Sequence, residues 1–560
     1  MITSLRNEKK LKGLDIEKIL KKQKLVFAIW NGSSKKTDPY PLFYLPLKKL
    51  FGKAILFDPR KIRHLEGSEK MNELFFSLID KEKPNYVFTN VRRDEQTIET
   101  MEKIREISPN TKIIAFSGDD DKDFEPLKRY QALFVDCTFV AQPNYLKNYY
   151  KDGVKNVFMQ AGTNLDIHKP IKNVKKIYDV TFIGKPSKPR VEIVKLLIDN
   201  KISIKLFGSS WENYPEFKEF CFGPLKADEM IKLVNQSKIN LAFSKNKNGI
   251  PHFKGRVNMY AACKSFSLVD YFSGYLKFFK NNKEIVMFKD NQDLLKKIKY
   301  YLTHDKEREK IAENSYKRII KEHDIFKEYK NLFTKMIEYP KIFSQKFPKI
   351  KGKIIILKKD DMKKSDTEIE ELLNGFDYIS FSDGDSLPLK YKNYLQAYSL
   401  EKTKKQISCC DYYVYDKILG NYLMTNIWRG FARLKREEFN QAISINQISV
   451  SKDYFIENLD KFKSFFEGEV INIIDEKNTC FISIPLVRIK KLNGIDSEII
   501  SSSFFHKSYA FNAYLLLKQK KIFNPILYRT IYLLLKNPAL MNSLIKFLKN
   551  KKKWNQAISL

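Results

Sequence analysis

The stretch from residue 178 to residue 271 constrains the fold of this chain more than any other part of its sequence. It alternates short apolar runs with helical patterns, in the order 180–183, 189–200, 204–207, 227–237 and 239–243. Strands that alternate with helices indicate βαβ units and a parallel sheet. The first run ends directly in Gly184, and a glycine at the carboxyl end of a strand lets backbone amides approach a phosphate. We therefore expect a ligand site at this edge of the sheet.

A similar alternation precedes that stretch. Strand-like runs lie at 25–30, 54–57, 86–89, 112–116 and 138–141. Together with helical patterns between them, these runs predict a second parallel sheet. We expect residues 1–165 and residues 166–340 to form two Rossmann-like domains, which end where Pro340 and Pro348 punctuate a lysine-rich linker.

The motifs of the second domain resemble the donor-binding half of GT-B glycosyltransferases of the CgeB-like, spore-protein type group. The matching segments are 178–184 (YDVTFIG), 206–208 (LFG), 237–241 (SKINL), 254–256 (KGR), 282–286 (NKEIV) and 300–323. The resemblance extends over residues 25–335 and implies a hexosyltransferase-like enzyme that uses a nucleotide-sugar donor. The first domain would then hold the acceptor.

Five residues are candidates for binding the donor: Gly184, Lys185, Arg190, Lys254 and Arg256. Arginine offers a planar fork of hydrogen-bond donors to diphosphate oxygens, and lysine offers a point charge. Such cations stabilise a departing diphosphate, and the resemblance implies that they do so without a metal. The alternative is that these charges lie on solvated loops.

The sequence departs from the family pattern directly after Arg256. The family usually carries Phe-Glu there, whereas this chain continues with Val257, Asn258 and Met259. A thioether is only a weak hydrogen-bond acceptor and cannot replace a carboxylate. This difference favours a second hypothesis, a non-catalytic carbohydrate- or membrane-binding protein built on an inactive GT-B frame.

Acidic residues follow the run at 112–116, at the end where a cleft could open. Asp119 or Asp120 could act as a general base on an acceptor hydroxyl, which requires a carboxylate within hydrogen-bonding reach. The alternative is an Asp-rich turn that caps the next helix. Among the isolated histidines, His252 is the best candidate for a functional role because it precedes Lys254 in the same loop.

A third module, residues 351–500, begins with another strand-like run. The run at 376–381 leads into Asp383 and Asp385, a pattern that resembles the Asp-x-Asp motif of family-two, GT-A glycosyltransferases. Two carboxylates at this spacing could hold Mn²⁺ or Mg²⁺ on a diphosphate. Too few residues precede the motif for the usual first two βαβ units, each of about 30 residues. The module is either a second catalytic site, making the enzyme two-headed, or a degenerate domain for acceptor binding or packing.

The last segment, residues 501–560, contains eleven Lys and Arg residues and no Asp or Glu. Apolar clusters interleave with these cations, so basic amphipathic helices could lie on an anionic membrane, as would suit a lipid-linked glycan acceptor. Packing of the same helices on the protein is the alternative. The net charge of +36 is otherwise scattered, and without a recognisable motif nucleic acid is an unlikely partner.

The cysteines and the first residues of the chain indicate the cellular compartment of the protein. Six cysteines fit neither a zinc pattern nor a disulfide framework, the first residues are charged, and no apolar run reaches about 18 residues. We therefore expect a cytosolic α/β protein, peripheral at the membrane if the tail binds lipid. It would consist of two Rossmann-like GT-B domains, a smaller GT-A-like segment and a basic helical tail, and it would glycosylate a surface glycan or a protein.

Overall fold

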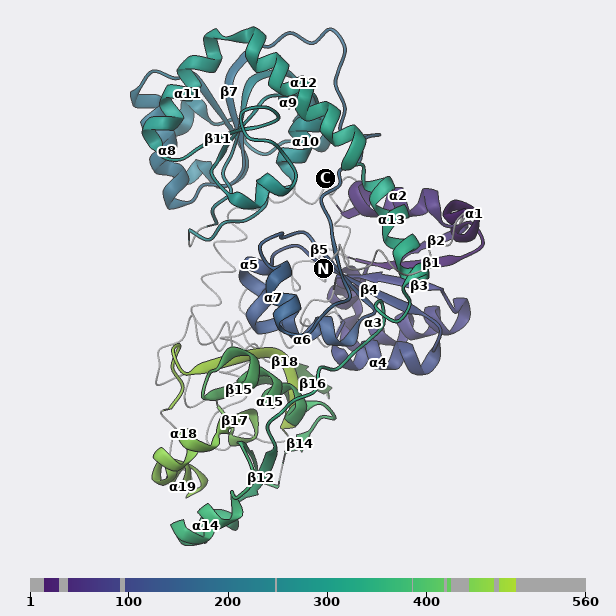
Figure 1. Ribbon diagram of the computed structural model, residues 1–560, viewed down its shortest axis with the longest axis vertical. Coiled ribbons are helices and arrows are strands. Elements are labelled where there is room, and N and C mark those ends of the chain that lie inside the picture. Colours follow the sequence, from purple (N-terminus) through teal and green to yellow (C-terminus); the bar gives the residue numbers. More distant parts are fainter. Residues whose placement is uncertain are drawn as a thin grey trace.

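Three β-sheets organise the molecule (Figure 1). The computed structural model describes residues 15–29, 39–90, 96–246, 249–384, 386–416, 421–424, 443–467 and 473–489. The predicted tail, residues 501–560, and Asp385 lie outside the described residues. Among the helices within them, none is both long and apolar enough to cross a membrane.

The first sheet is parallel throughout and has the strand order β2-β1-β3-β4-β5-β6. Its strands are β1 (Lys24–Ala28), β2 (Lys53–Leu56), β3 (Tyr86–Thr89), β4 (Lys112–Ser117), β5 (Cys137–Val140) and β6 (Val157–Met159). Strands β3 and β5 are buried along their whole length, as expected where helices cover both faces of a sheet. These helices include α3 (Pro59–Glu82) and α4 (Ile98–Ile107).

The second sheet is also parallel, with the strand order β11-β10-β9-β7-β8. Its strands are β7 (Tyr178–Ile183), β8 (Ile204–Phe207), β9 (Ser237–Ala242), β10 (Ser267–Asp270) and β11 (Val286–Phe288). Helices α8 (Lys188–Asp199) and α11 (Asn291–Thr303) pack on one face, and α9 (Ala227–Gln236) and α10 (Arg256–Ala262) pack on the other (Figure 1). Two parallel sheets in sequence confirm the prediction made from the alternating pattern.

Two further helices follow the second sheet and its helices, which together form the second module. The second of these two helices packs on the first module, which consists of the first sheet and its helices. After α12 (Asp305–Glu322), helix α13 (Ile325–Glu338) packs against the first sheet instead of the second. Tyr329, Leu332 and Phe333 are fully buried there, and the ring of Phe333 meets that of Phe51 edge-on at 5.0 Å. The first sheet therefore completes its core with a helix that follows the second sheet in sequence.

The third sheet is mixed, with the order β12-β13-β17-β15-β18-β14 and β16 beside β15. Its strands are β12 (Ile354–Lys358), β13 (Tyr378–Ser382), β14 (Leu387–Pro388), β15 (Ile407–Asp416), β16 (Asn421–Met424), β17 (Ile448–Ser451) and β18 (Thr479–Ile489). Its helices are α14 (Asp366–Leu372), α15 (Lys392–Thr403), α18 (Lys452–Glu457) and α19 (Leu459–Glu467). The α/β character predicted for this module is present.

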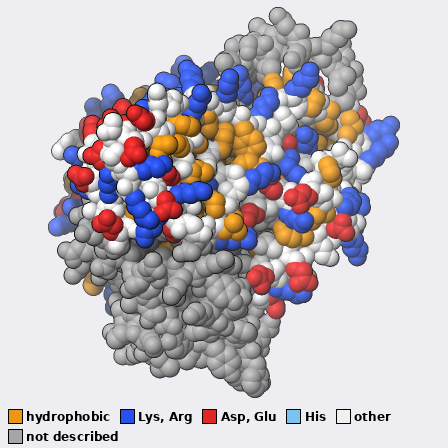
Figure 2. All heavy atoms as spheres, turned by 90° about the horizontal axis from the view of Figure 1, so that it is seen from below, with side chains coloured by type: hydrophobic (Ala, Val, Ile, Leu, Met, Phe, Trp, Pro, Cys, Tyr) orange, Lys and Arg blue, Asp and Glu red, His pale blue; other side chains and the backbone are white. Residues whose placement is uncertain are grey.

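The third sheet shares one continuous hydrophobic core with the first. The ring of Phe134 meets that of Tyr391 edge-on at 4.8 Å, and the Tyr398 hydroxyl donates to the carbonyl oxygen of Asp152 at 3.0 Å. Figure 2 shows the described surface from below, where Lys and Arg side chains are mixed with Asp and Glu. On this face the positive charge is scattered, as predicted from the sequence.

Candidate active site

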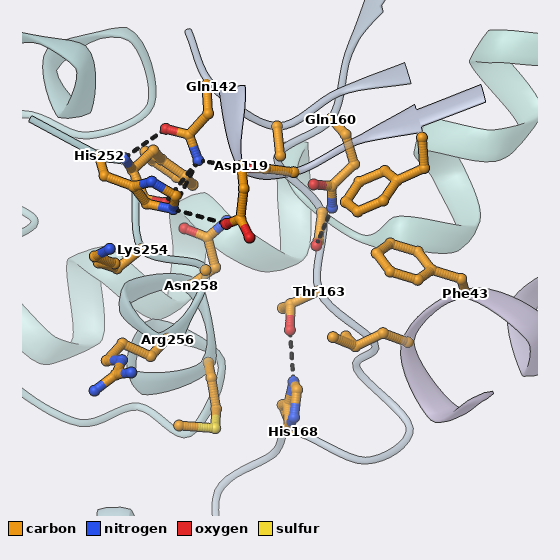
Figure 3. A pocket seen from close by; sticks show the side chains of 18 of the residues that line it. Phe43, Asp119, Gln142, Gln160, Thr163, His168, His252, Lys254, Arg256 and Asn258 are labelled. Atoms are coloured by element: carbon orange, nitrogen blue, oxygen red, sulfur yellow. Dashed lines mark hydrogen bonds and ion pairs between the residues drawn. The ribbon is translucent and has the colours of Figure 1, made fainter. Parts of the chain in front are cut away.

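A cavity of about 580 Å³ lies between the first and second sheets (Figure 3). Asp119 and Gln142 reach it from the carboxyl ends of β4 and β5, whereas His252, Lys254 and Arg256 come from the loop that follows β9 and from the start of α10. Ligands of parallel α/β sheets bind at this end of the strands, because the connecting loops there can diverge to form a crevice.

Three cations gather on the second-sheet wall. Lys254 and Arg256 line the cavity, and Arg190 lies next to them at the start of α8. Burial, together with the charges of Arg190 and Arg256, lowers the pKa of Lys254 to about 8. Burial and the charge of Arg256 likewise lower the pKa of Arg190. None of the three forms an ion pair with a carboxylate of the described residues, so their combined charge is suited to an anion.

The glycines at the strand ends let this cluster approach the backbone. A Cβ at Gly184 would lie 3.0 Å from Nη1 of Arg256, and one at Gly208 would lie only 2.5 Å from the carbonyl oxygen of Gly184. That oxygen accepts a 2.7 Å hydrogen bond from Nε1 of Trp211. Side chains at either glycine would therefore push the guanidinium group and the strand ends apart.

The five predicted donor-binding residues occupy different places. Lys254 and Arg256 face the cavity, and Gly184 lies directly behind Arg256. Arg190 lines a second hollow of about 470 Å³ and donates from Nη1 to the Lys185 carbonyl oxygen at 2.9 Å. The side chain of Lys185 is exposed and does not line the cavity.

The acidic run on the first-sheet wall sends its three carboxylates in three directions, because it begins the short helix α5 (Asp120–Asp123). Asp119 lines the cavity with its side chain 54% exposed. Asp120 points into the core, where it accepts hydrogen bonds from Ser117 Oγ at 2.6 Å and the Tyr149 hydroxyl at 2.8 Å. Burial raises the pKa of Asp120. Of the two predicted candidates for the general base, only Asp119 faces the cavity.

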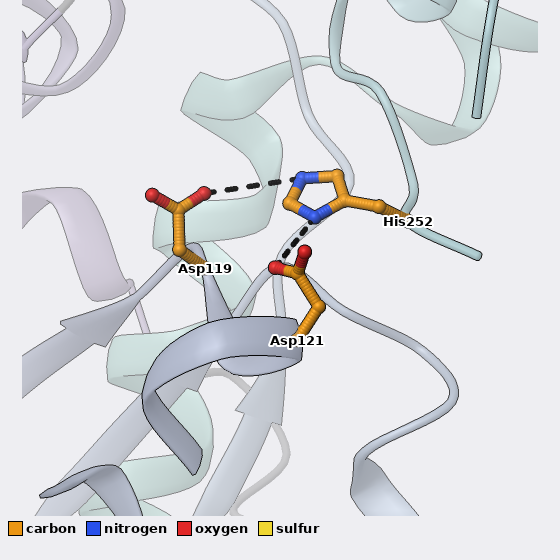
Figure 4. Close-up of side chains that lie close together, drawn as sticks. All are labelled: Asp119, Asp121 and His252. Carbon is orange, nitrogen blue, oxygen red and sulfur yellow. Dashed lines mark hydrogen bonds and ion pairs between the residues drawn. The ribbon is translucent and has the colours of Figure 1, made fainter. Parts of the chain in front are cut away.

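Asp121, which sequence reasoning did not single out, pairs with His252 across the cleft (Figure 4). Nδ1 of His252 lies 2.8 Å from Oδ1 of Asp121, and Nδ2 of Asn246 donates to the other carboxylate oxygen at 2.6 Å. Burial raises the pKa of Asp121, but these two hydrogen bonds have the larger combined effect and lower the pKa to about 2. The run of three aspartates was the available signal, but it could not show which one would meet the histidine.

The other nitrogen of His252 faces the first-sheet wall. It lies 3.0 Å from Nε2 of Gln142 and 4.0 Å from Oδ1 of Asp119. One ligand atom from each of Asp119, Asp121 and His252 lies within 4.8 Å of the others, which is a spacing that a metal ion could use. In the structure, His252 and Asp121 instead satisfy each other by a hydrogen bond.

The side chain of Gln142 connects the two walls of the cavity through hydrogen bonds. Its Oε1 accepts from the Phe253 backbone amide at 2.8 Å, and its Nε2 donates to the Gly118 carbonyl oxygen at 2.9 Å. Further along the same edge, Nζ of Lys277 donates to the carbonyl oxygen of Pro143 at 3.0 Å. The cavity is therefore closed on one side by direct contacts between the two modules.

Of the two aspartates predicted to bind a metal in the third module, Asp383 forms hydrogen bonds with neighbouring side chains and backbone. Asp383 accepts hydrogen bonds from the Ser386 amide at 3.0 Å, from the Ser386 hydroxyl at 3.3 Å, and from the Asn446 side chain. These bonds hold Asp383 in the loop after β13, where its carboxylate accepts from a backbone amide three residues later. Asp385 lies outside the described residues, so metal binding by this pair stays a prediction.

Comparisons with known proteins find similarity over part of the chain. Residues 190–334 match a family model described as glycosyl transferase-like. No curated protein matches the sequence. Solved structures with a similar arrangement include sucrose-phosphate synthase from Thermosynechococcus elongatus (11% identity, TM-score 0.43, covering 56% of this chain and 99% of that one). They also include Anabaena HepE in complex with UDP and glucose (9%, TM-score 0.44, 56% and 99%) and a Rickettsia africae glycosyltransferase (15%, TM-score 0.41, 56% and 98%).

Proposed function

We propose that this protein is a glycosyltransferase that transfers a hexose-type sugar from a nucleoside diphosphate-sugar to a hydroxyl acceptor and releases the nucleoside diphosphate. The observation that carries the proposal is the cluster of Arg190, Lys254 and Arg256, three cations without a carboxylate partner among the described residues, beside a cavity between two parallel sheets. The match of residues 190–334 to a glycosyl transferase-like family model supports it, since that stretch contains all three cations.

In this proposal the diphosphate of the donor lies against Lys254 and Arg256, with Arg190 behind them. Positive charge placed where the leaving diphosphate gains negative charge stabilises the transition state, and this needs no metal. Uridine is the nucleoside that we would test first, because HepE, one of the similar structures, was solved with UDP and glucose.

Asp119 is the proposed general base on the acceptor side. Its carboxylate lies on the first-sheet wall of the cavity and is accessible, whereas the buried, hydrogen-bonded Asp120 is not positioned to reach an acceptor. His252 lies 4.0 Å from Asp119, beyond hydrogen-bonding distance, so its charge rather than a direct bond would act on that carboxylate. The acceptor would be a surface glycan, a lipid-linked glycan or a protein, and a cytosolic location with membrane contact through residues 501–560 belongs to the same proposal.

Calorimetric titration of the full chain with UDP and UDP-glucose tests the donor site. Arg256→Ala should weaken binding of both by about ten- to a hundredfold, because hydrogen bonds to charged groups each contribute about 1.5–3 kcal/mol. Lys185→Ala is the matched control, since this exposed lysine does not line the cavity. It should bind like the unaltered protein.

Two results would contradict the proposal. One is the absence of binding by the folded, unaltered protein to UDP, GDP, CDP and dTDP and to their glucose derivatives. The other is binding that Arg256→Ala leaves unchanged. A parallel titration with EDTA and with Mn²⁺ separates this site from Asp383 and Asp385, because only a second, metal-dependent site would require the ion. Binding that needs Mn²⁺ and survives Arg256→Ala would favour the two-headed enzyme.

A further inference from the structure

His168 lines the same cavity as the cations but belongs to the segment that connects the two modules. Its Nδ1 lies 2.5 Å from the hydroxyl oxygen of Thr163, another residue of the cavity wall. No other described residue forms a hydrogen bond with its ring, so Nε2 remains available to a ligand. In Figure 3, His168 and Arg256 lie below Asp119 and Gln142, which places the imidazole toward the cation end of the cavity.

A short turn holds this imidazole in place. The backbone amide of His168 donates to the carbonyl oxygen of Asn164 at 2.8 Å, and the Asn164 side chain donates to the carbonyl oxygen of Pro41 at 2.6 Å. The backbone of Thr163 forms two hydrogen bonds at the junction of α12 and α13: its amide donates to the His323 carbonyl oxygen at 2.9 Å, and its carbonyl oxygen accepts from the Ile325 amide at 3.0 Å. The ring is therefore positioned before any ligand binds, which reduces the entropy that binding costs.

The chemistry of this wall suits a neutral ligand group. Burial lowers the pKa of His168 to about 4, so the imidazole is uncharged at neutral pH. A neutral imidazole with one nitrogen held by Thr163 offers a single directed hydrogen bond. Lys254 and Arg256, in the same cavity, attract phosphate oxygens, whereas a hydroxyl group needs only such a neutral partner.

We propose that Nε2 of His168 binds a hydroxyl group of the donor, on either its ribose or its transferred sugar. The inference rests on the proposed function and extends it. It assigns to His168 the recognition of a sugar hydroxyl group of the nucleotide-sugar. The side chain of Thr163 fixes the ring, and Arg256 holds the diphosphate at a neighbouring position.

Titrations of the full chain with UDP and with UDP-glucose test this role. We expect His168→Ala to weaken binding of UDP-glucose by about three- to tenfold, the effect of one hydrogen bond between neutral groups. His168→Gln should recover most of the loss, because the glutamine amide reaches the position of Nε2. His304→Ala is the matched control, since His304 is exposed on α11's C-terminal end and lies outside the cavity.

The two ligands locate the hydroxyl. Equal weakening of UDP and UDP-glucose by His168→Ala would place it on the ribose, and weakening of UDP-glucose alone would place it on the transferred sugar. Unchanged binding of both ligands, in a variant that melts like the unaltered protein, would overturn the inference. In that case Arg256→Ala would still weaken binding if the proposed function holds, whereas a folded protein that binds neither ligand would overturn both.

Discussion

At the scale of single residues, the charge state of Lys254 connects the structure to solution behaviour. Its ammonium group is partly buried between two arginines, and both effects favour the neutral amine. A bound diphosphate does the opposite, because an anion favours the charged form. The lysine is therefore poised to lose its proton just above neutral pH unless the anion is present.

We expect the affinity for UDP-glucose to fall as the pH rises from 7 to 9. The pKa of Lys254 is lowered to about 8, so its charge is present below that pH and lost above it. Lys254→Arg should flatten this dependence, because arginine keeps its charge throughout the range. Calorimetry at four pH values measures the effect, and UDP-glucose is preferred to UDP because its diphosphate has no terminal group that titrates there. An affinity that is independent of pH in both proteins would show that Lys254 does not contact the diphosphate.

At the scale of elements, α13 belongs to a different module from the one that its position in the sequence indicates. This helix follows the second sheet along the chain but buries its apolar face against β1 and β3 of the first. The crossing is fixed at its start, where a Cβ at Gly162 would lie 2.7 Å from the Cα of Ile325. The first module, predicted to be residues 1–165, therefore lacks part of its core unless α13 is supplied.

We expect Leu332→Ala to destabilise the first module by about 2–5 kcal/mol, the usual effect of truncating a fully buried leucine. Hydrogen exchange in urea, followed by mass spectrometry, should show β3 becoming exposed at lower urea while β9 of the second sheet is unaffected. Leu74→Ala on α3 is the control, since Leu74 is 41% exposed and should have little effect. If β9 alone responds to Leu332→Ala, α13 belongs to the second module.

At the scale of the whole molecule, the third module acts as part of the first. The two share one hydrophobic core, and Tyr398 of α15 is 1% exposed, with its ring 6.3 Å from that of Tyr130. Arg488 and Glu99 add an ion pair across the same boundary at 3.2 Å. An interface of this kind resembles a domain interior more than a contact between independent domains.

We expect Tyr398→Ala to lower the stability of the first and third sheets together, by roughly 3–5 kcal/mol, as for other large-to-small changes of aromatic core residues. Hydrogen exchange should show β3 and β17 opening at the same reduced urea concentration. Tyr150→Ala, at a tyrosine that is 37% exposed, serves as the control. A change confined to β17 would mean that the third module unfolds independently of the first.

The sequence by itself determined the elements and the charged wall of the site. The alternation of apolar runs placed β7 and β9 within three residues of their observed bounds, because strand and helix periods are local properties of the chain. Lys254 and Arg256 were predicted from the KGR motif at 254–256, which resembles the donor-binding motif of the family, and from the affinity of such cations for a diphosphate. The acidic run was found too, but not the direction of each carboxylate.

Only the tertiary structure decided which side chains meet. Asp121 and His252 are 131 positions apart and pair because two separate sheets face each other, and His168 enters the cavity because the connecting segment crosses α13. The docking of the third module on the first likewise depends on the fit of aromatic rings such as Phe134 and Tyr391. Local periodicity carries no information about such contacts, because they are selected by the packing of whole elements and not by the order of neighbouring residues.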